Sequence, residues 1–141
     1  MTRETRPPKP LLLSIDDEVT NNFTRRLLLE SAGYSVLVAH RGYEGLAMLK
    51  ANQVDAVIVD YLMPDMKGGE VVQEIRRIKP SVPILMLSGC LEIPASVVAM
   101  VDACISKAEP PALLFSHIES VLHKPPTSVP RGSNHRSYGV A

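Results

Sequence analysis

Short runs of apolar residues recur along the middle of the chain and alternate with longer segments of mixed polarity. The runs are rich in branched aliphatic side chains, which favour strands, and each interval has room for one helix. This alternation predicts a parallel sheet covered by helices on both faces. The predicted strands are LLLSI at 11–15, YSVLVA at 34–39, DAVIVD at 55–60, PILMLS at 83–88 and ACIS at 103–106.

Apolar residues at helical spacing locate helices between these runs. The first helix is expected to pass through Val19, Phe23 and Leu27, with Gly33 as its C-terminal stop. Two later stripes fit helices that lie on a sheet, Val71, Val72, Ile75 and Ile78 in one and Leu114, Ile118, Val121 and Leu122 in the other.

Segment 93–101 shows little amphipathic contrast, and we expect a short helix there with Pro94 in the first position. The whole pattern predicts an α/β doubly wound fold, (βα)5 and flavodoxin-like, with strand order 2-1-3-4-5.

The two ends of the chain differ in composition from the middle. A folded domain is predicted only for residues 10–123, between a flexible segment at 1–9 and a disordered tail at 124–141 that is rich in Pro, Ser and Gly. VPRGS at 129–133 resembles an engineered protease-site linker, and a natural disordered tail explains it equally well.

Composition narrows the class of protein. With 141 residues, 45% of them hydrophobic, the chain has the size of one globular domain. Cys90 and Cys104 are the only cysteines, and no segment looks like a signal peptide or is long enough to cross a bilayer. A soluble, cytoplasmic protein without disulfides or membrane contact is therefore predicted.

Charge is distributed unevenly although the net charge is zero. Residues 1–10 carry a net charge of +2 and residues 124–141 carry +3, which leaves −5 on residues 11–123. An acidic folded body argues against direct binding of nucleic acid, because phosphate backbones require clustered Lys and Arg.

Polar residues follow the predicted central strands at their carboxyl ends. Parallel strands bring these ends to one edge of the sheet, so the residues are expected to form one cluster. They are Asp16, Asp17, Asp60, Ser88 and Lys107.

Clustered carboxylates repel one another, by roughly 3 kcal/mol per pair at about 6 Å and an effective dielectric constant of about 20. Mg²⁺ would compensate this repulsion, since it prefers a few carboxylates, waters and a phosphate. Asp60 stands alone after the middle strand and is the best candidate for a nucleophile that forms an aspartyl phosphate. Asp17, followed by Glu18, has the alternative reading of a helix cap.

This set of residues closely resembles the receiver domains of two-component response regulators. The resemblance covers residues 10–123 and rests on the paired Asp16 and Asp17, on D-Y-L-M-P-D-M-K-G from Asp60, on L-S-G at 87–89 and on Lys107. Since no output domain follows in this sequence, it looks like a single-domain member of that family.

The resemblance implies a role for each matching residue. Asp60 would be the phosphoacceptor, and Mg²⁺ would be bound by Asp16, Asp17, Asp60 and the backbone carbonyl of Leu62. The phosphoryl group would be held by Ser88 and Lys107. The resemblance also assigns residues to the pocket and the loop, namely Gly89 as the small residue and Pro64 and Gly68 as the loop pattern.

Two positions depart from the family pattern. Cys104 stands where most members carry the Tyr or Phe of the phosphorylation switch, and Ala108 stands where most have a proline in a cis peptide bond. A trans bond or a remodelled loop is expected before Ala108, because a cis bond to a non-proline residue costs about 3 kcal/mol. The read-out of phosphorylation is thus expected to differ from that of better-known members.

Four readings of the function compete. The favoured one is a phosphoacceptor that receives its phosphoryl group from a sensor histidine kinase or phosphotransfer protein and signals to an unknown downstream protein, with homodimerisation left open. The alternatives are a phosphorylation-independent docking or dimerisation module and a receiver fragment of a larger regulator. An enzyme acting on external substrates is disfavoured, because Leu62 occupies the position of the second acidic residue that aspartyl-phosphate hydrolases need.

Overall fold

The computed structural model describes residues 8–89 and 93–123, in which five strands alternate with five helices. The predicted tail at 124–141, residues 1–7 of the predicted N-terminal segment, and Cys90 lie outside the described residues. The strands are β1 Leu11–Ile15, β2 Ser35–Ala39, β3 Ala56–Asp60, β4 Ile84–Ser88 and β5 Ala103–Ser106. The helices are α1 Val19–Ser31, α2 Gly42–Ala51, α3 Gly68–Ile78, α4 Ala95–Val98 and α5 Pro111–His123.

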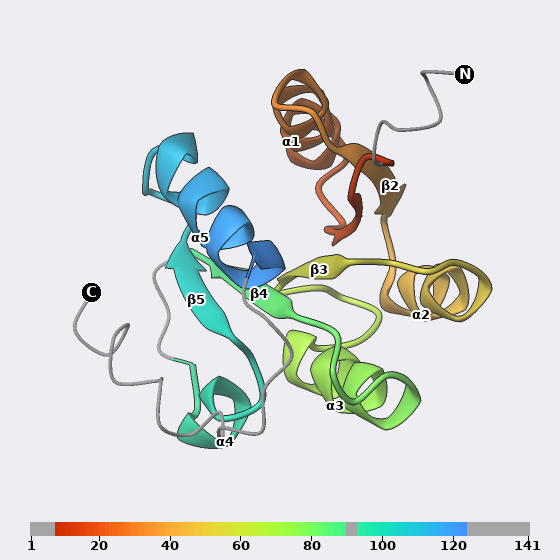
Figure 1. Cartoon of the computed structure of the whole chain (residues 1–141). Helices are drawn as coiled ribbons and strands as arrows, with labels where there is room; N and C mark the ends of the chain where they lie inside the picture. Colours follow the sequence, from red (N-terminus) through yellow and green to blue (C-terminus); the bar gives the residue numbers. More distant parts are fainter. Residues whose placement is uncertain (1–7, 90–92, 124–141) are drawn as a thin grey trace.

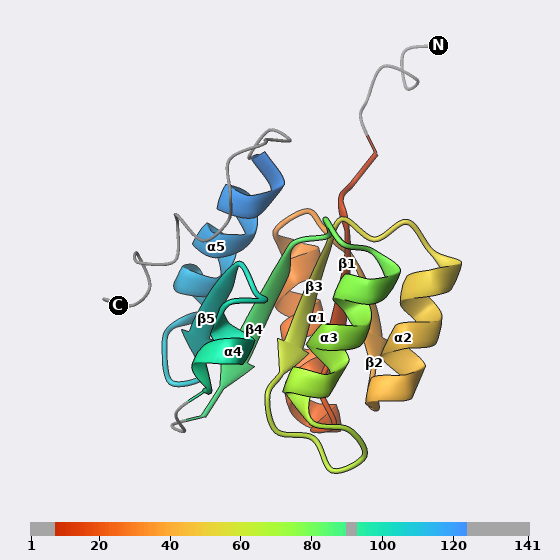
Figure 2. The same ribbon diagram turned by 90° about the horizontal axis from the view of Figure 1, so that it is seen from below.

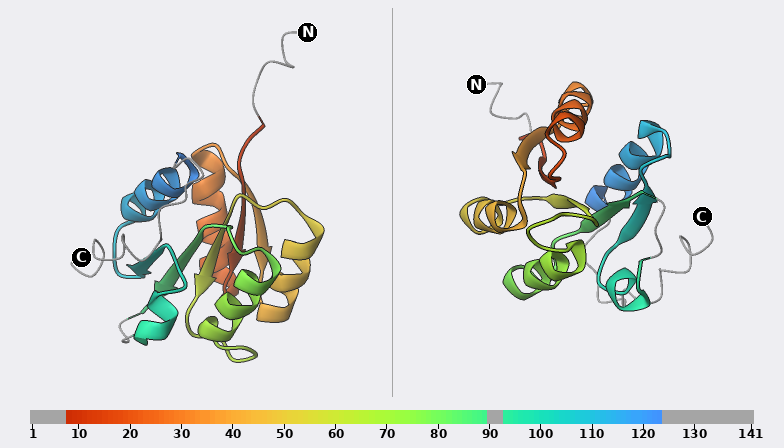
Figure 3. Two further views of the ribbon diagram at one scale, coloured as in Figure 1. Left: turned by 60° about the horizontal axis from the view of Figure 1, so that its bottom comes forward. Right: turned by 180° about the vertical axis from the view of Figure 1, so that it is seen from behind.

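The strands form one parallel sheet in the order β2-β1-β3-β4-β5, which confirms the predicted doubly wound fold. Helices α1 and α5 cover one face of the sheet, and α2, α3 and α4 cover the other (Figures 1 and 3). The strand arrows point the same way, so the loops that follow them emerge at one edge (Figure 2). In the register of β3 and β4, Asp60 lies beside Leu87. The edge that carries the polar residues is therefore set by strand pairing.

Alternate residues of the strands divide the core into two clusters, one on each face. Toward α2 and α3 the sheet contributes Leu13, Ile15, Val57 and Val59, and toward α1 and α5 it contributes Leu12, Ala56, Ile58 and Leu85. Every residue of β3 is buried, as expected for the central strand of a sheet covered on both faces. The predicted stripes of α3 and α5 supply buried residues to these clusters, Val71, Val72 and Ile75 from α3 and Leu114 and Ile118 from α5.

Helix α1 occupies the predicted segment but turns its apolar stripe outward. The side chains of Val19, Phe23 and Leu27 are 58%, 52% and 49% exposed, whereas Asn22 and Leu29 are fully buried. The Asn22 amide hydrogen-bonds to main-chain carbonyls at the ends of β1 and β2, and this orients the polar side of the helix toward the sheet.

The C-terminal end of α1 matches its prediction. The helix ends at Ser31, and Gly33 follows with a φ of +103°, the left-handed conformation that favours glycine.

Helix α4 is shorter than the predicted segment 93–101, and Pro94 precedes the helix instead of occupying its first position. With a φ of −56° and a ψ of 145°, Pro94 has extended backbone, and the helix ends after Val98. The Arg76 guanidinium binds the Met100 carbonyl at 2.8 Å, which turns the chain toward β5. The peptide bond between Lys107 and Ala108 is trans, as predicted.

Candidate functional site

Three carboxylates meet at the carboxyl edge of the sheet. Asp16 and Asp17 follow β1, and Asp60 ends β3; one oxygen of each lies within 4.8 Å of the others. The Asp16 carboxylate accepts a hydrogen bond from the Glu18 N–H at 3.0 Å, and α1 starts after Glu18 without a side-chain cap. Asp17 is therefore not a helix cap. In the part of the chain described, the Asp17 carboxylate has no hydrogen-bond or ion-pair partner.

Lys107 is the cation nearest to the phosphoacceptor candidate. Its Nζ lies 3.1 Å from Asp60 Oδ1 and 3.6 Å from Asp16 Oδ2. Lys107 follows β5, and its N–H donates to the Ser88 carbonyl at 2.7 Å, which ties it to the end of β4. The ammonium therefore bridges two of the carboxylates that the sequence analysis expected to repel each other.

Asp60 is 4% exposed, and its environment disfavours a negative charge. Burial, followed by the charge of Asp16, raises the pKa of the Asp60 carboxyl to about 6, while the Lys107 ammonium opposes the rise. Without a further cation, a substantial fraction of Asp60 is thus protonated near pH 6. The three carboxylates offer hard oxygen ligands, and Lys107 compensates only part of their negative charge. Such a set of ligands fits Mg²⁺.

The raised pKa makes the stability of the metal-free protein depend on Asp60. Because the folded chain holds this proton more tightly than the unfolded chain, stability is lost as the pH rises through about 6. Asp60→Asn is expected to raise the free energy of unfolding by about 1–2 kcal/mol at pH 8 in EDTA, after allowance for solvent screening. The gain should shrink between pH 6 and pH 4. Urea unfolding of both proteins across this range measures it, and an equally or less stable variant at pH 8 would contradict it.

A buried polar network that was not predicted from the sequence lies on the α1 side of Asp16. The Ser14 hydroxyl donates to Asn22 Oδ1 at 2.7 Å and accepts from Arg25 Nη1 at 3.1 Å. Arg25 Nη2 then binds Asp16 Oδ2 at 3.0 Å. The sequence contains one signal of this network, because Ser14 is a polar residue within the otherwise apolar strand LLLSI. Asn22 and Arg25 lie one helical turn apart and can therefore both reach it.

The loop after Asp60 is held by its own main chain. The Leu62 N–H donates to Asp60 Oδ1 at 3.4 Å, and the Gly68 N–H donates to the Tyr61 carbonyl at 2.9 Å. A Cβ on Gly68 would lie 2.6 Å from the Tyr61 Cα, so only glycine fits this approach of two backbones. Pro64 is exposed in this loop. Gly68 therefore keeps the loop, and with it Leu62, close to Asp60.

Ser88 and Gly89 lie at the end of β4, next to the edge that carries Asp60. In the described part of the chain the Ser88 hydroxyl forms no hydrogen bond, so it is available to a ligand. A Cβ on Gly89 would meet no described atom within 4 Å, so steric crowding does not require glycine there.

Cys104 lies in β5 and packs partly buried against the core cluster on the α3 side. Burial raises the pKa of its thiol to about 11, which keeps the sulfur protonated and weakly nucleophilic at neutral pH. The residue that the resemblance assigns to the aromatic switch is thus a small, partly buried thiol.

No helix in residues 8–89 and 93–123 is long and apolar enough to cross a membrane.

Comparison with known proteins places the chain in a family. Residues 12–119 match the model of the response regulator receiver domain. The Transcriptional regulatory protein GlrR of Escherichia coli (strain K12) is 34% identical over 116 residues, which are 80% of this chain and 26% of that protein. The chain thus spans a minor part of this longer relative.

Solved structures agree with the family match. A response regulator receiver domain protein from Clostridium thermocellum has a TM-score of 0.75 and 30% identity, over 80% of this chain and 94% of that one. The response regulator protein TrrA from Thermotoga maritima, in complex with Mg²⁺-BeF, has a TM-score of 0.76 and 26% identity, over 80% of this chain and 99% of that one. The fold, the acidic pocket and these matches together show that the chain belongs to the response regulator receiver domain family of two-component signalling proteins.

Proposed function

We propose that this chain accepts a phosphoryl group on Asp60 from a sensor histidine kinase or a phosphotransfer protein and passes the change to a protein partner. The contact that carries the proposal is the one between Lys107 Nζ and Asp60 Oδ1, at 3.1 Å beside two further carboxylates. A buried aspartate with one oxygen held by an ammonium is oriented to act as a nucleophile.

In the transfer, a carboxylate oxygen of Asp60 forms a bond to phosphorus while the bond from phosphorus to the donor atom breaks. Lys107 would follow the charge that moves onto the phosphoryl oxygens, and the Ser88 hydroxyl would donate a hydrogen bond to one of them. Asp16, Asp17, Asp60 and the Leu62 carbonyl would hold Mg²⁺, which supplies positive charge to the group in transfer. The Mg²⁺-BeF complex of TrrA supports this assignment of the metal.

The test of the proposal is intact-mass analysis after incubation of the chain with acetyl phosphate and Mg²⁺. We expect a gain of one phosphoryl group that disappears when EDTA replaces the metal. A known receiver domain treated in parallel shows that the donor is active. If that control gains mass and this chain does not, the proposal is wrong.

A second function has one observation in its favour. Cys104 replaces the aromatic switch residue, and the neighbouring α4 has only four residues, so the face that reports phosphorylation in related domains is altered. A module that docks or dimerises without phosphate would suit such a face. Turnover of external substrates is not proposed, because Leu62, two positions after Asp60, has an exposed aliphatic side chain that cannot act as an acid or base.

A further inference from the structure

Arg25 places a second cation against the acidic cluster, from an element that the phosphoacceptor site does not otherwise use. Its side chain is only 12% exposed, and Nη2 lies 3.0 Å from Asp16 Oδ2. Nη1 lies 3.1 Å from the Ser14 hydroxyl and 3.5 Å from Asn22 Oδ1. The guanidinium is thus held in one orientation by three groups, two of which are neutral and fully buried.

Asp16 has both of its carboxylate oxygens engaged. Oδ1 accepts the Glu18 N–H at 3.0 Å, and Oδ2 faces Arg25 Nη2 at 3.0 Å and Lys107 Nζ at 3.6 Å. With Asp17 and Asp60, the cluster carries three negative charges, against which Arg25 and Lys107 set two positive charges. In the metal-free protein the side chains therefore compensate part of the negative charge of the cluster, and Arg25 supplies one of the two compensating charges.

A divalent cation at the same carboxylates would add two positive charges beside that guanidinium. Because like charges a few ångströms apart repel strongly where solvent is excluded, Arg25 and the cation compete for Asp16. Lys107 is in a different position, because the incoming phosphoryl group gives its ammonium a new partner. Arg25, by contrast, forms no ion pair with Asp60 in the part of the chain described, so the phosphoryl group on Asp60 does not replace a partner that Arg25 loses.

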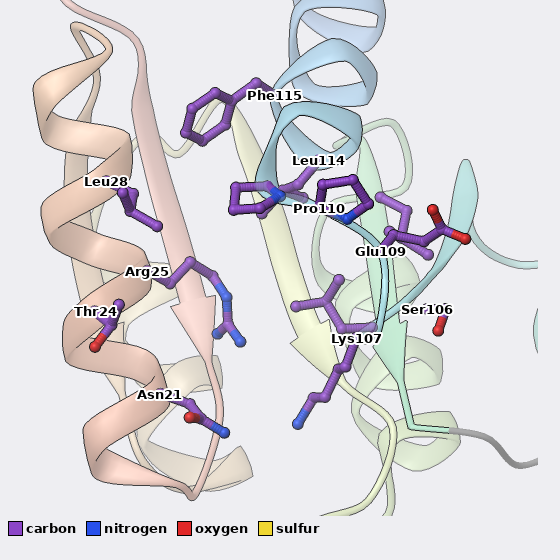
Figure 4. Close-up of a pocket in the computed structure, with 13 residues that line it drawn as sticks. Asn21, Thr24, Arg25, Leu28, Ser106, Lys107, Glu109, Pro110, Leu114 and Phe115 are labelled. Carbon is purple, nitrogen blue, oxygen red and sulfur yellow. The ribbon is translucent and has the colours of Figure 1, made fainter.

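The structure provides room for Arg25 to leave Asp16. A cavity of about 300 Å³ lies between α1 and the segment that joins β5 to α5, and Arg25 lines it together with Asn21 and Thr24 of the same helix. Arg25 and Lys107 extend into this space from opposite sides (Figure 4).

We propose that Arg25 is a positioning residue that holds Asp16 in the metal-free protein and leaves it for the cavity when Mg²⁺ binds, so that it lowers the affinity for the metal. This inference rests on the metal site of the proposed function. The chain thereby carries its own competitor for Mg²⁺, and metal occupancy changes the surface between α1 and α5.

Titration of the EDTA-treated chain with MgCl₂ in a calorimeter at constant ionic strength tests the proposal. Arg25→Gln is expected to lower the dissociation constant about tenfold, because the repulsive charge is gone. Arg25→Lys keeps the charge and should stay within about threefold of the wild type. The matched control is Arg26→Gln on the same helix, whose partner is the exposed Glu30, and no change is expected there.

A second readout follows the side chain itself. In the ¹⁵N-labelled wild type, the Nε–Hε resonance of Arg25, assigned by its absence in Arg25→Gln, should shift on saturation with Mg²⁺. In EDTA, Arg25→Gln should unfold at lower urea concentration than the wild type, since the buried Asp16 carboxylate loses the nearer of its two cationic partners.

Unchanged or weaker Mg²⁺ binding by Arg25→Gln would overturn the competition, because a purely structural residue gives one of these two results. An Arg25 resonance that does not move at saturating Mg²⁺ would overturn the displacement. If the wild type binds Mg²⁺ and the variant matches it, only the role of Arg25 is wrong. If neither protein binds Mg²⁺, the metal site is wrong and the role of Arg25 falls with it.

Discussion

Asp60→Asn is expected to abolish the phosphoryl gain that acetyl phosphate and Mg²⁺ produce in the wild type. An amide oxygen is a far weaker nucleophile than a carboxylate, and Asp17, the least buried carboxylate of the cluster, lacks the ammonium contact that orients Asp60. The variant should remain folded, because removal of this buried charge is expected to stabilise the metal-free chain. Loss of phosphorylation can then be assigned to the missing nucleophile.

The matched control for this experiment is Asp65→Asn in the same loop. Asp65 Oδ2 accepts the Gly42 N–H at 2.9 Å, and the amide oxygen of asparagine can accept the same bond. Intact-mass analysis should show the full gain in Asp65→Asn and none in Asp60→Asn. A gain in the Asp60 variant that survives hydroxylamine, which cleaves acyl phosphates, would place the phosphoryl group on another type of residue.

Arg76→Met is expected to lower the free energy of unfolding by about 3 kcal/mol, the largest loss that we predict for a residue remote from the site. The guanidinium donates to the carbonyls of Met100 and Val82 at 2.8 and 2.6 Å and binds Asp102 Oδ2 at 3.1 Å. Asp102 is only 6% exposed and also accepts the Ile84 N–H at 2.8 Å. Without the guanidinium, the buried Asp102 carboxylate, the carbonyls of Pro80 and Val82 before β4, and the Met100 carbonyl before β5 lose a charged partner.

Urea unfolding monitored by circular dichroism measures this loss, with Arg77→Met as the matched control. Arg77 is 68% exposed and pairs with Glu74 on the surface of α3, so its replacement should leave the free energy of unfolding nearly unchanged. Addition of Asp102→Asn to Arg76→Met should recover part of the stability, because the buried charge is removed as well. A loss below 1 kcal/mol in Arg76→Met would show that solvent replaces the guanidinium.

The order of the elements, the parallel sheet and the members of the acidic cluster can all be predicted from the sequence. Strands such as AVIVD are apolar throughout because both faces of the sheet are covered, and this property is visible without coordinates. Parallel pairing then brings Asp16, Asp60 and Lys107 to one edge whatever the side chains around them. The roles of these residues in phosphorylation came from resemblance to a family.

Other features could not be read from local patterns. Val19, Phe23 and Leu27 predict the helix α1 correctly but do not show which side of it meets the sheet. These side chains lie toward solvent, and Asn22 is buried because it bonds to the carbonyls of Asp16 and Ala39. Those carbonyls come together only after β1 and β2 have paired, so no periodicity along the chain records them.

The length of α4 and the place of Arg25 were decided in the same way. Arg76 reaches 26 residues along the chain to Asp102 and fixes where the segment before β5 turns. Nothing in the sequence distinguishes Arg25 from the other arginines, and only in the folded chain does its guanidinium contact Asp16. Burial patterns repeat over a few residues and can be read locally, whereas a long polar side chain takes its partner from whatever the tertiary structure brings within its reach.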